Sequence, residues 1–228
     1  MIITGTRKGI GKYLVEYYIN KGYTIYGCSR QEVDFSFPDY HHTVMDVFDE
    51  TAVINLISKV RKSHGRLDVL INNAGIASMN HSLLTPMDTM EKAYKTNVFG
   101  AFLFMRESAK LMKKNKFGRI VNFVTIATPL NLEGEASYAS SKGALESLTK
   151  VMAKDLGENG ITINAIGPCP VDTDLLKNVP QEKVDKLLSY QSIKRYAKME
   201  DISNTIDFFI DPKSEFITGQ IIYLGGIS

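Results

Sequence analysis

Short runs of apolar residues alternate with longer amphipathic segments along the whole chain. The apolar runs are rich in Val and Ile and predict strands at 2–4, 23–28, 42–47, 67–73, 119–125, 161–167 and 220–224. Helical periodicity with charged outer faces predicts helices at about 10–21, 50–63, 88–114, 137–157 and 200–210. Such alternation is typical of an α/β fold, a doubly wound parallel sheet of about seven strands with helices on both faces.

One connection departs from this pattern. Residues 29–42 (SRQEVDFSFPDYHH) join two predicted strands, and they contain Pro38 and three aromatic residues without helical periodicity. We expect an irregular crossover there. No internal repeat and no Gly/Ser/Pro-rich linker divides the chain, and 228 residues suffice for one substantial core. We therefore expect a single domain over residues 1–228.

Composition narrows the classes of function. A net charge of +2 gives no strong electrostatic attraction to nucleic acid or membrane, and no uncharged apolar run approaches the roughly 18 residues that span a bilayer. The early turn at Thr4 and Gly5 leaves no room for a signal peptide, and Cys28 and Cys169 lack C-x-x-C spacing. We expect reduced thiols and a cytoplasmic protein. The four histidines show no metal-ligand spacing, so no metal site is assigned.

The segment TGTRKGIG (4–11) follows the first predicted strand and opens the first helix. Its glycines permit a tight turn and let a pyrophosphate approach backbone N–H groups at the positive end of the helix. The spacing GxxxGxG differs from the GxGxxG fingerprint, but α/β sheets bind ligands beyond the carboxyl ends of their strands. This favours a Rossmann-like domain that binds a nucleotide at this turn. The expected contacts in this turn are Gly5, Thr6, Arg7, Lys8, Gly9, Ile10 and Gly11.

The segment SYASSK (137–142) places Tyr138 and Lys142 four residues apart, on one face of a predicted helix. Two heads on one face can converge on one ligand, which would suit a catalytic pair. Tyr17 with Lys21, and Tyr190 with Lys194, have the same spacing. Spacing alone therefore does not decide between a catalytic and a packing role.

Several motifs in order resemble those of short-chain dehydrogenases/reductases over essentially the whole chain. The segments that carry the resemblance are TGxxxGIG at 4–11, Asp46-Val47, Asn72-Asn73-Ala74-Gly75, Asn97-Val98-Phe99-Gly100, the YxxxK of Tyr138 and Lys142, NAIGPCPVDTDL and FITGQIIYLGG. The overall pattern is most similar to 3-oxoacyl-acyl-carrier-protein reductases. In this pattern Tyr138 and Lys142 are the catalytic pair, whereas Tyr17 and Tyr190 are expected to be surface or packing residues.

The resemblance implies a reaction in which NADPH gives hydride to a carbonyl carbon while Tyr138 gives a proton to its oxygen. Lys142 would favour the phenolate and bind the nicotinamide ribose, and Asn97 would hold a water in the proton relay. Thr125, thirteen residues before Tyr138, stands where the family usually has a serine. The further cofactor contacts that the resemblance implies are Asp46, Val47, Asn73, Ala74, Gly75, Tyr138, Lys142, Pro168, Val171 and Thr173.

The cofactor preference is expected to be NADP(H) over NAD(H). The second predicted strand ends with Ser29, where NAD-preferring relatives usually show an acidic residue, and Arg30 follows. An arginine can pair with a 2′-phosphate that an aspartate would repel, and Lys8 adds positive charge. Elsewhere Pro168-Cys169-Pro170 replaces the usual Pro-Gly, and Cys169 is interpreted as a buried packing residue more readily than as a reactive thiol.

We interpret the chain as an NADP(H)-dependent carbonyl reductase or alcohol dehydrogenase, acting on a small-molecule or acyl-thioester carbonyl substrate. A sugar or other small-ketone reductase of the same family remains an alternative, as does a catalytically silent nucleotide-binding regulator. A sugar-nucleotide epimerase would need a C-terminal substrate domain. The segments expected around the substrate, 77–85, 127–135 and 170–195, are the least patterned, so substrate and direction stay open. Family resemblance further implies a homotetramer or homodimer through helices 88–114 and 137–157.

Overall fold

The structure, a computed structural model, describes residues 1–171 and 181–227. These residues form a seven-stranded sheet in the order β3-β2-β1-β4-β5-β6-β7, in which every neighbouring pair is parallel. The strands are β1 (Ile2–Thr4), β2 (Ile25–Ser29), β3 (Tyr40–Val44), β4 (Val69–Asn72), β5 (Gly118–Phe123), β6 (Ile161–Gly167) and β7 (Ile221–Tyr223). The predicted Rossmann-like, doubly wound sheet is confirmed.

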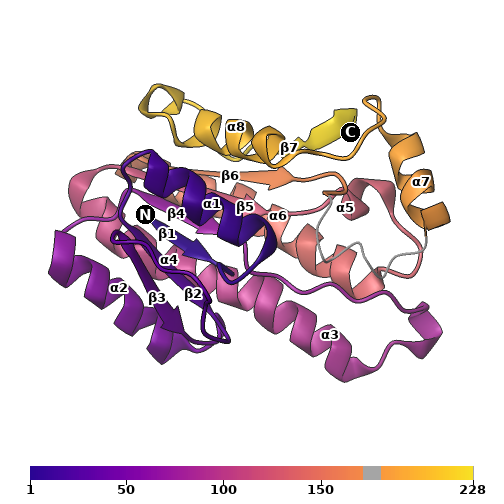
Figure 1. The fold of residues 1–228 in the computed structure, drawn as a ribbon, viewed down its shortest axis with the longest axis horizontal. Helices are drawn as coiled ribbons and strands as arrows, with labels where there is room; N and C mark the ends of the chain where they lie inside the picture. Colours follow the sequence, from indigo (N-terminus) through magenta and orange to yellow (C-terminus); the bar gives the residue numbers. More distant parts are fainter. Residues whose placement is uncertain (172–180, 228) are drawn as a thin grey trace.

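Helices cover both faces of the sheet, with α1 and α8 on one side and α2, α4 and α6 on the other (Figure 1). The helices are α1 (Gly9–Asn20), α2 (Glu50–His64), α3 (Met87–Tyr94), α4 (Ala101–Met112), α5 (Ala127–Leu130), α6 (Ala136–Leu156), α7 (Gln181–Tyr190) and α8 (Met199–Ile210). A π-helical segment, η2 (Lys95–Gly100), joins α3 to α4.

The core consists of one apolar cluster on each face. Phe104 of α4 packs on the first face, and Tyr18 of α1 packs with Phe209 of α8 on the second, all three nearly inaccessible to solvent. Every residue of β5 and β6 is buried. A strand covered on both faces buries every position, polar ones included: Arg119 and Asn122 of β5, and Thr162 and Asn164 of β6, are buried.

Two details differ from the sequence prediction. The single helix expected over 88–114 is interrupted by η2, which widens the helix for six residues at its centre. The helices α5 and α7 were not predicted, because α5 has only four residues and α7 lies in a segment with little apolar periodicity. The irregular crossover over 29–42 is confirmed up to the start of β3, and Phe35 stacks on Tyr40 within it at 5.3 Å between ring centroids.

The strand order reverses between β1 and β4, which are adjacent in the sheet although β2 and β3 separate them in the chain. Connections after these two strands run to opposite sides, so a crevice opens at their carboxyl ends. Among the described residues no helix is long and apolar enough to cross a membrane.

Candidate active site

The glycine turn after β1 is shaped by close contacts that exclude side chains. Gly5 has φ 73°, in the left-handed region, and a Cβ on Gly11 would lie 2.1 Å from the Gly5 carbonyl oxygen. The helix can therefore approach the turn only with glycine at these positions. Lys8 is the N-cap of α1, and no side chain caps the helix there. The first backbone N–H groups thus lack an intrahelical partner and suit an anion.

The turns after β1 and β4 are fastened together at the crevice. The Asn73 side-chain amide donates to the carbonyl oxygens of Thr4 (2.9 Å) and Gly5 (3.1 Å). In return the Thr4 hydroxyl oxygen accepts from the backbone N–H groups of Asn73 (3.1 Å) and Ala74 (2.9 Å). This reciprocal set fixes the two loops before any ligand binds.

A cavity of about 620 Å³ opens over the two loops. The expected cofactor residues that line it are Gly5, Arg7, Lys8, Gly9, Ile10, Gly11, Arg30, Asp46, Val47, Asn73, Ala74 and Gly75. Ser29, Gln31, Met45, Ile76 and Thr96 also line it. Of these five, only Ser29 carries a signal in the sequence, its place at the end of a predicted strand.

Thr6, which was expected to contact the cofactor, does not line the cavity. It is fully buried beneath the turn, where the Tyr40 hydroxyl donates to its Oγ1 at 2.7 Å. Tyr40 comes from the irregular crossover and the start of β3, so sequence patterns gave no reason to place it there. The glycine turn thus rests on a tyrosine from the neighbouring strand.

The four expected catalytic residues come from three segments that meet beside this cavity. Tyr138 and Lys142 lie one turn apart on α6, Thr125 follows β5, and Asn97 lies in η2. A Cβ on Gly75, at the edge of the cavity, would lie 3.3 Å from both Lys142 Nζ and Asn97 Oδ1. The cavity therefore ends at the residues expected to be catalytic.

The electrostatics of the pair run against one expectation. Burial raises the pKa of Tyr138 to about 12, a hydrogen bond with the Thr125 side chain lowers it, and the charge of Glu135 raises it. Burial also lowers the pKa of Lys142 to about 8. The Lys142 ammonium donates to the Phe123 carbonyl oxygen at 2.6 Å. The pKa of Tyr138 thus moves opposite to the expected direction, because desolvation of the phenolate outweighs any help from the lysine.

Asn97 is held on all sides by protein groups. Its Oδ1 accepts from the Ile76 N–H (2.9 Å), and its Nδ2 donates to the Ile76 carbonyl (2.9 Å) and to Ser141 Oγ (2.9 Å). Ser141 in turn donates to the Tyr138 carbonyl oxygen. The widened turn of η2 brings this amide between the loop after β4 and α6. Segments of π-helix often occur at functional sites.

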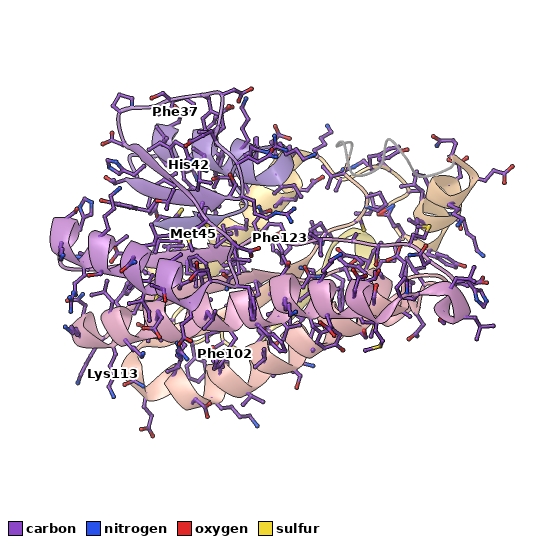
Figure 2. All side chains as sticks on the ribbon, turned by 90° about the horizontal axis from the view of Figure 1, so that it is seen from below. Phe37, His42, Met45, Phe102, Lys113 and Phe123 are labelled. Carbon is purple, nitrogen blue, oxygen red and sulfur yellow. The ribbon has the colours of Figure 1, made fainter. Side chains whose placement is uncertain are left out.

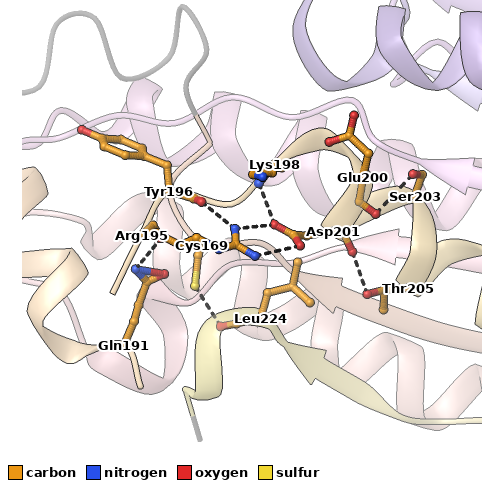
Figure 3. Close-up of polar contacts among 10 residues, drawn as sticks. All are labelled: Cys169, Gln191, Arg195, Tyr196, Lys198, Glu200, Asp201, Ser203, Thr205 and Leu224. Atoms are coloured by element: carbon orange, nitrogen blue, oxygen red, sulfur yellow. Dashed lines mark hydrogen bonds and ion pairs between the residues drawn. The ribbon is translucent and has the colours of Figure 1, made fainter. Parts of the chain in front are cut away.

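The end of β6 lies beside the segment between α7 and α8. Cys169 is buried, its thiol donates to the Leu224 carbonyl at 2.8 Å, and burial raises its pKa to about 11, so it is a packing residue and not an activated thiol (Figure 3). Arg195 pairs with both carboxylate oxygens of Asp201 (2.7 and 3.0 Å). Pro168 is half-buried and Val171 is buried. The expected contact Thr173 lies outside the described residues.

The other two tyrosine–lysine pairs have different places. Tyr17 and Lys21 both donate to one carboxylate oxygen of Asp207, which ties α1 to α8. Tyr190 is exposed at the end of α7. Neither pair lies by the cavity, so position in the fold separates Tyr138 and Lys142 from them.

One further residue near the pair was not anticipated. Glu135 precedes Tyr138 by three residues at the start of α6, and burial raises the pKa of its carboxyl, while the positive charge of Lys183 on α7 lowers it. The neighbouring backbone is pinned, since Asn80 N donates to the Gly134 carbonyl at 2.8 Å. The charge of this carboxyl group acts on Tyr138.

A parallel sheet with a glycine cradle at its switch point, leading to a half-buried tyrosine and a buried lysine, defines a nucleotide-dependent oxidoreductase. A family described as enoyl-(acyl carrier protein) reductase matches residues 5–227, and the chain belongs to this family of short-chain dehydrogenases/reductases.

The similar proteins include curated enzymes and solved structures. The 3-oxoacyl-[acyl-carrier-protein] reductase FabG of Staphylococcus aureus is 28% identical, over 99% of this chain and 96% of the relative. The structure of ElxO with NADP bound has a TM-score of 0.89 and 30% identity, over 98% of this chain and 95% of that one. A candidate gluconate dehydrogenase from Agrobacterium tumefaciens has a TM-score of 0.88 and 26% identity, over 99% of this chain and 93% of that one.

Proposed function

We propose that residues 1–228 act as one dinucleotide-binding catalytic domain that transfers hydride between NADP(H) and a ketone or secondary alcohol. The observation that carries this proposal is the continuity between the glycine-lined cavity and the group of Thr125, Tyr138 and Lys142. The residues present fit a dinucleotide. The cradle at Gly5 and Gly11 has no room for side chains, and the α1 N-terminus lacks a side-chain cap.

When bound, NADPH supplies the hydride. The protein's part in reduction is to hold the carbonyl oxygen between the Thr125 hydroxyl and the Tyr138 phenol, and Tyr138 donates the proton to that oxygen. Because the pKa of Tyr138 is about 12 here, the phenol is protonated at neutral pH, as a proton donor must be. In this proposal Lys142 binds the nicotinamide ribose, and Asn97 orders the water that returns the proton.

We propose NADP(H) in preference to NAD(H). Ser29 stands at the end of β2 in place of an acidic residue that would repel a 2′-phosphate, and Arg30, Arg7 and Lys8 also line the cavity. The bound NADP of ElxO supports this assignment. Loss of at least tenfold in NADPH affinity, but not NADH affinity, is expected for Arg30→Ala. Equal kcat/KM for the two cofactors in the wild type would contradict the preference.

For the substrate we favour a 3-oxoacyl thioester, because the FabG relatives span the chain nearly end to end. A sugar-derived ketone is the alternative, favoured by the similarity to a candidate gluconate dehydrogenase. Comparing kcat/KM for a 3-oxoacyl thioester with that for sugar-derived ketones of similar size separates the two. A clear preference for the sugar ketones would overturn the thioester assignment while leaving the reductase assignment intact.

Both cysteines are free, in keeping with a cytoplasmic enzyme.

A further inference from the structure

His42 lies on β3 beside the cavity residue Ser29, at the edge of the sheet near Phe37 and Met45 (Figure 2). Its Nε2 is 2.9 Å from Ser29 Oγ. The Ser29 hydroxyl has a single proton, which it donates to the Gln31 carbonyl oxygen at 2.7 Å. It follows that Nε2 carries a proton and donates to Ser29 Oγ.

The second ring nitrogen has no hydrogen-bond partner. His42 Nδ1 is buried and unpaired, and the side chain is only 8% exposed. Glu32 Oε2 lies 3.6 Å from Nδ1, just beyond hydrogen-bond distance, and the Glu32 side chain is largely exposed. If Nδ1 carried a proton, that proton would point at the Glu32 carboxylate. Without the proton, Nδ1 and Glu32 Oε2 are two hydrogen-bond acceptors that face each other. The ring is therefore built to accept one proton.

The surroundings of the His42 ring act on its pKa in opposite directions. Burial lowers the pKa of His42 below its ordinary value, and Glu32 raises it. The other neighbours are uncharged at neutral pH: Ser29 on β2 and Tyr40 on β3, whose ring centroid is 6.1 Å from that of His42. Two further charged groups lie on neighbouring segments. Lys12 of α1 pairs with Asp34 of the crossover between β2 and β3 at 3.7 Å, and Arg30 lines the cavity. In the free protein the ring is neutral near pH 7.

A phosphate monoester beside Ser29 would change this balance. Its negative charge favours the imidazolium form of a ring that touches the same hydroxyl. We propose that Ser29, His42 and Glu32 form a relay that recognises the 2′-phosphate of NADP(H): the Ser29 hydroxyl turns its proton from the Gln31 carbonyl to a phosphate oxygen while it still accepts from His42 Nε2, and His42 takes up a proton from solvent on Nδ1, which faces Glu32. His42 is a positioning residue that acts through Ser29. The inference rests on the proposed use of NADP(H), and it adds a source of specificity to Arg30.

Isothermal titration calorimetry of the whole protein tests the relay directly. Titrating NADPH at pH 6.5 in buffers of different ionisation enthalpy gives the number of protons bound with the cofactor. We expect roughly 0.5 proton more for the wild type than for His42→Gln, since glutamine can still donate to Ser29 but cannot titrate. The comparison between variants cancels protons exchanged by the phosphate itself, whose second pKa is about 6.

Two controls make the result specific. NADH has no 2′-phosphate, so its binding should show no such difference between wild type and variant. His41→Gln changes the adjacent histidine, whose ring lies 4.7 Å from Tyr26, and should keep the wild-type proton uptake. The Kd for NADPH of the wild type, divided by that of His42→Gln, should rise with pH. The rise should reach about tenfold per pH unit between the pKa of His42 in the free protein and its pKa in the NADPH complex.

The possible outcomes are distinct. Equal proton uptake by the wild type and His42→Gln, with NADPH bound by both, would overturn the relay and leave the proposed function standing. A difference that also occurs with NADH would overturn it as well, because the phosphate would not be its cause. If the wild type binds no NADPH, the proposed cofactor fails and the relay fails with it.

Discussion

We propose that the Thr125 hydroxyl acts on the substrate oxygen together with Tyr138. Thr125 is buried after β5, its side chain lies close enough to Tyr138 to lower the pKa of that phenol, and its Oγ1 accepts from the Ala127 N–H at 3.2 Å. That last contact orients the hydroxyl. A threonine restricts χ1 more than a serine does, so its oxygen is held in fewer orientations.

Substitution at Thr125 separates the hydroxyl from the side-chain shape. Thr125→Val keeps the shape without the oxygen, and kcat should fall about 10²-fold or more, on the scale of removing one donor to a developing oxyanion. Thr125→Ser should retain most activity. Steady-state kinetics on the best ketone checks both variants, with NADPH affinity as the control that should not change. Near-normal turnover by Thr125→Val would show that Thr125 is not the active hydroxyl.

Lys142 gives a prediction for the pH dependence of stability. Burial lowers its pKa to about 8 in the folded chain, whereas a solvated lysine in the unfolded chain has the ordinary value of 10.5, so the unfolded state binds more protons between these values. The contribution of Lys142 to the free energy of unfolding should therefore rise with pH in this window, by up to about 1.4 kcal/mol per unit. Burial raises the pKa values of Cys28 and Cys169, so these thiols act in the opposite direction over the same range, and the lysine contribution must be measured as a difference from a variant that lacks Lys142.

Chemical denaturation across that range measures the effect, with Lys142→Met as the reference. The difference in free energy of unfolding between wild type and Lys142→Met should grow in favour of the wild type as the pH rises. A difference that stays constant or shrinks would mean that the ammonium is not desolvated in the folded protein.

At the scale of elements, the glycine turn and α1 depend on one close approach. A Cβ on Gly11 would lie 2.1 Å from the Gly5 carbonyl oxygen and 2.7 Å from Asn73 Nδ2. Gly11→Ala must therefore push the helix off the turn or break the Asn73 contacts. We expect a loss of about 1–3 kcal/mol in stability and a loss of at least tenfold in NADPH affinity.

A matched glycine provides the control for this variant. Gly157, at the end of α6, has φ −56° and no atom within 4 Å of an added Cβ. Gly157→Ala should leave NADPH affinity unchanged and stability equal or slightly higher. Thermal unfolding and cofactor titration of both variants make the comparison. Equal behaviour of the two variants would contradict the role given to the turn.

The elements were predictable to different degrees for physical reasons. All seven strands were recognisable as short segments rich in Val and Ile, although β5 and β6 also bury polar residues such as Asn122 and Asn164. The π-helical turn around Asn97 was not, since its residues keep helical periodicity on both sides. The sequence also did not reveal that the pKa of Tyr138 is raised, or that Tyr40 hydrogen-bonds Thr6 beneath the glycine turn. Both features depend on burial by segments distant in the chain.

At the scale of the whole molecule, two exposed apolar side chains favour assembly. Phe102 of α4 and Val151 of α6 are 36% and 54% exposed, on the helices expected to form an interface. We propose a homotetramer or homodimer through these helices. Light scattering at micromolar concentration should give at least twice the 25.5 kDa chain mass, and Phe102→Glu should shift it toward the monomer. A wild-type mass near 25.5 kDa would refute the assembly.

The central claim is that the chain reduces a carbonyl with hydride from NADPH and a proton from Tyr138. The most direct measurement is oxidation of NADPH across a panel of ketones and 3-oxoacyl thioesters, by the wild type and by Tyr138→Phe. We predict turnover of at least one substrate with one alcohol formed per NADPH, and a loss of about 10²-fold or more in Tyr138→Phe without loss of NADPH binding. Tight NADPH binding with no turnover of any substrate would contradict the account and indicate a nucleotide-binding regulator.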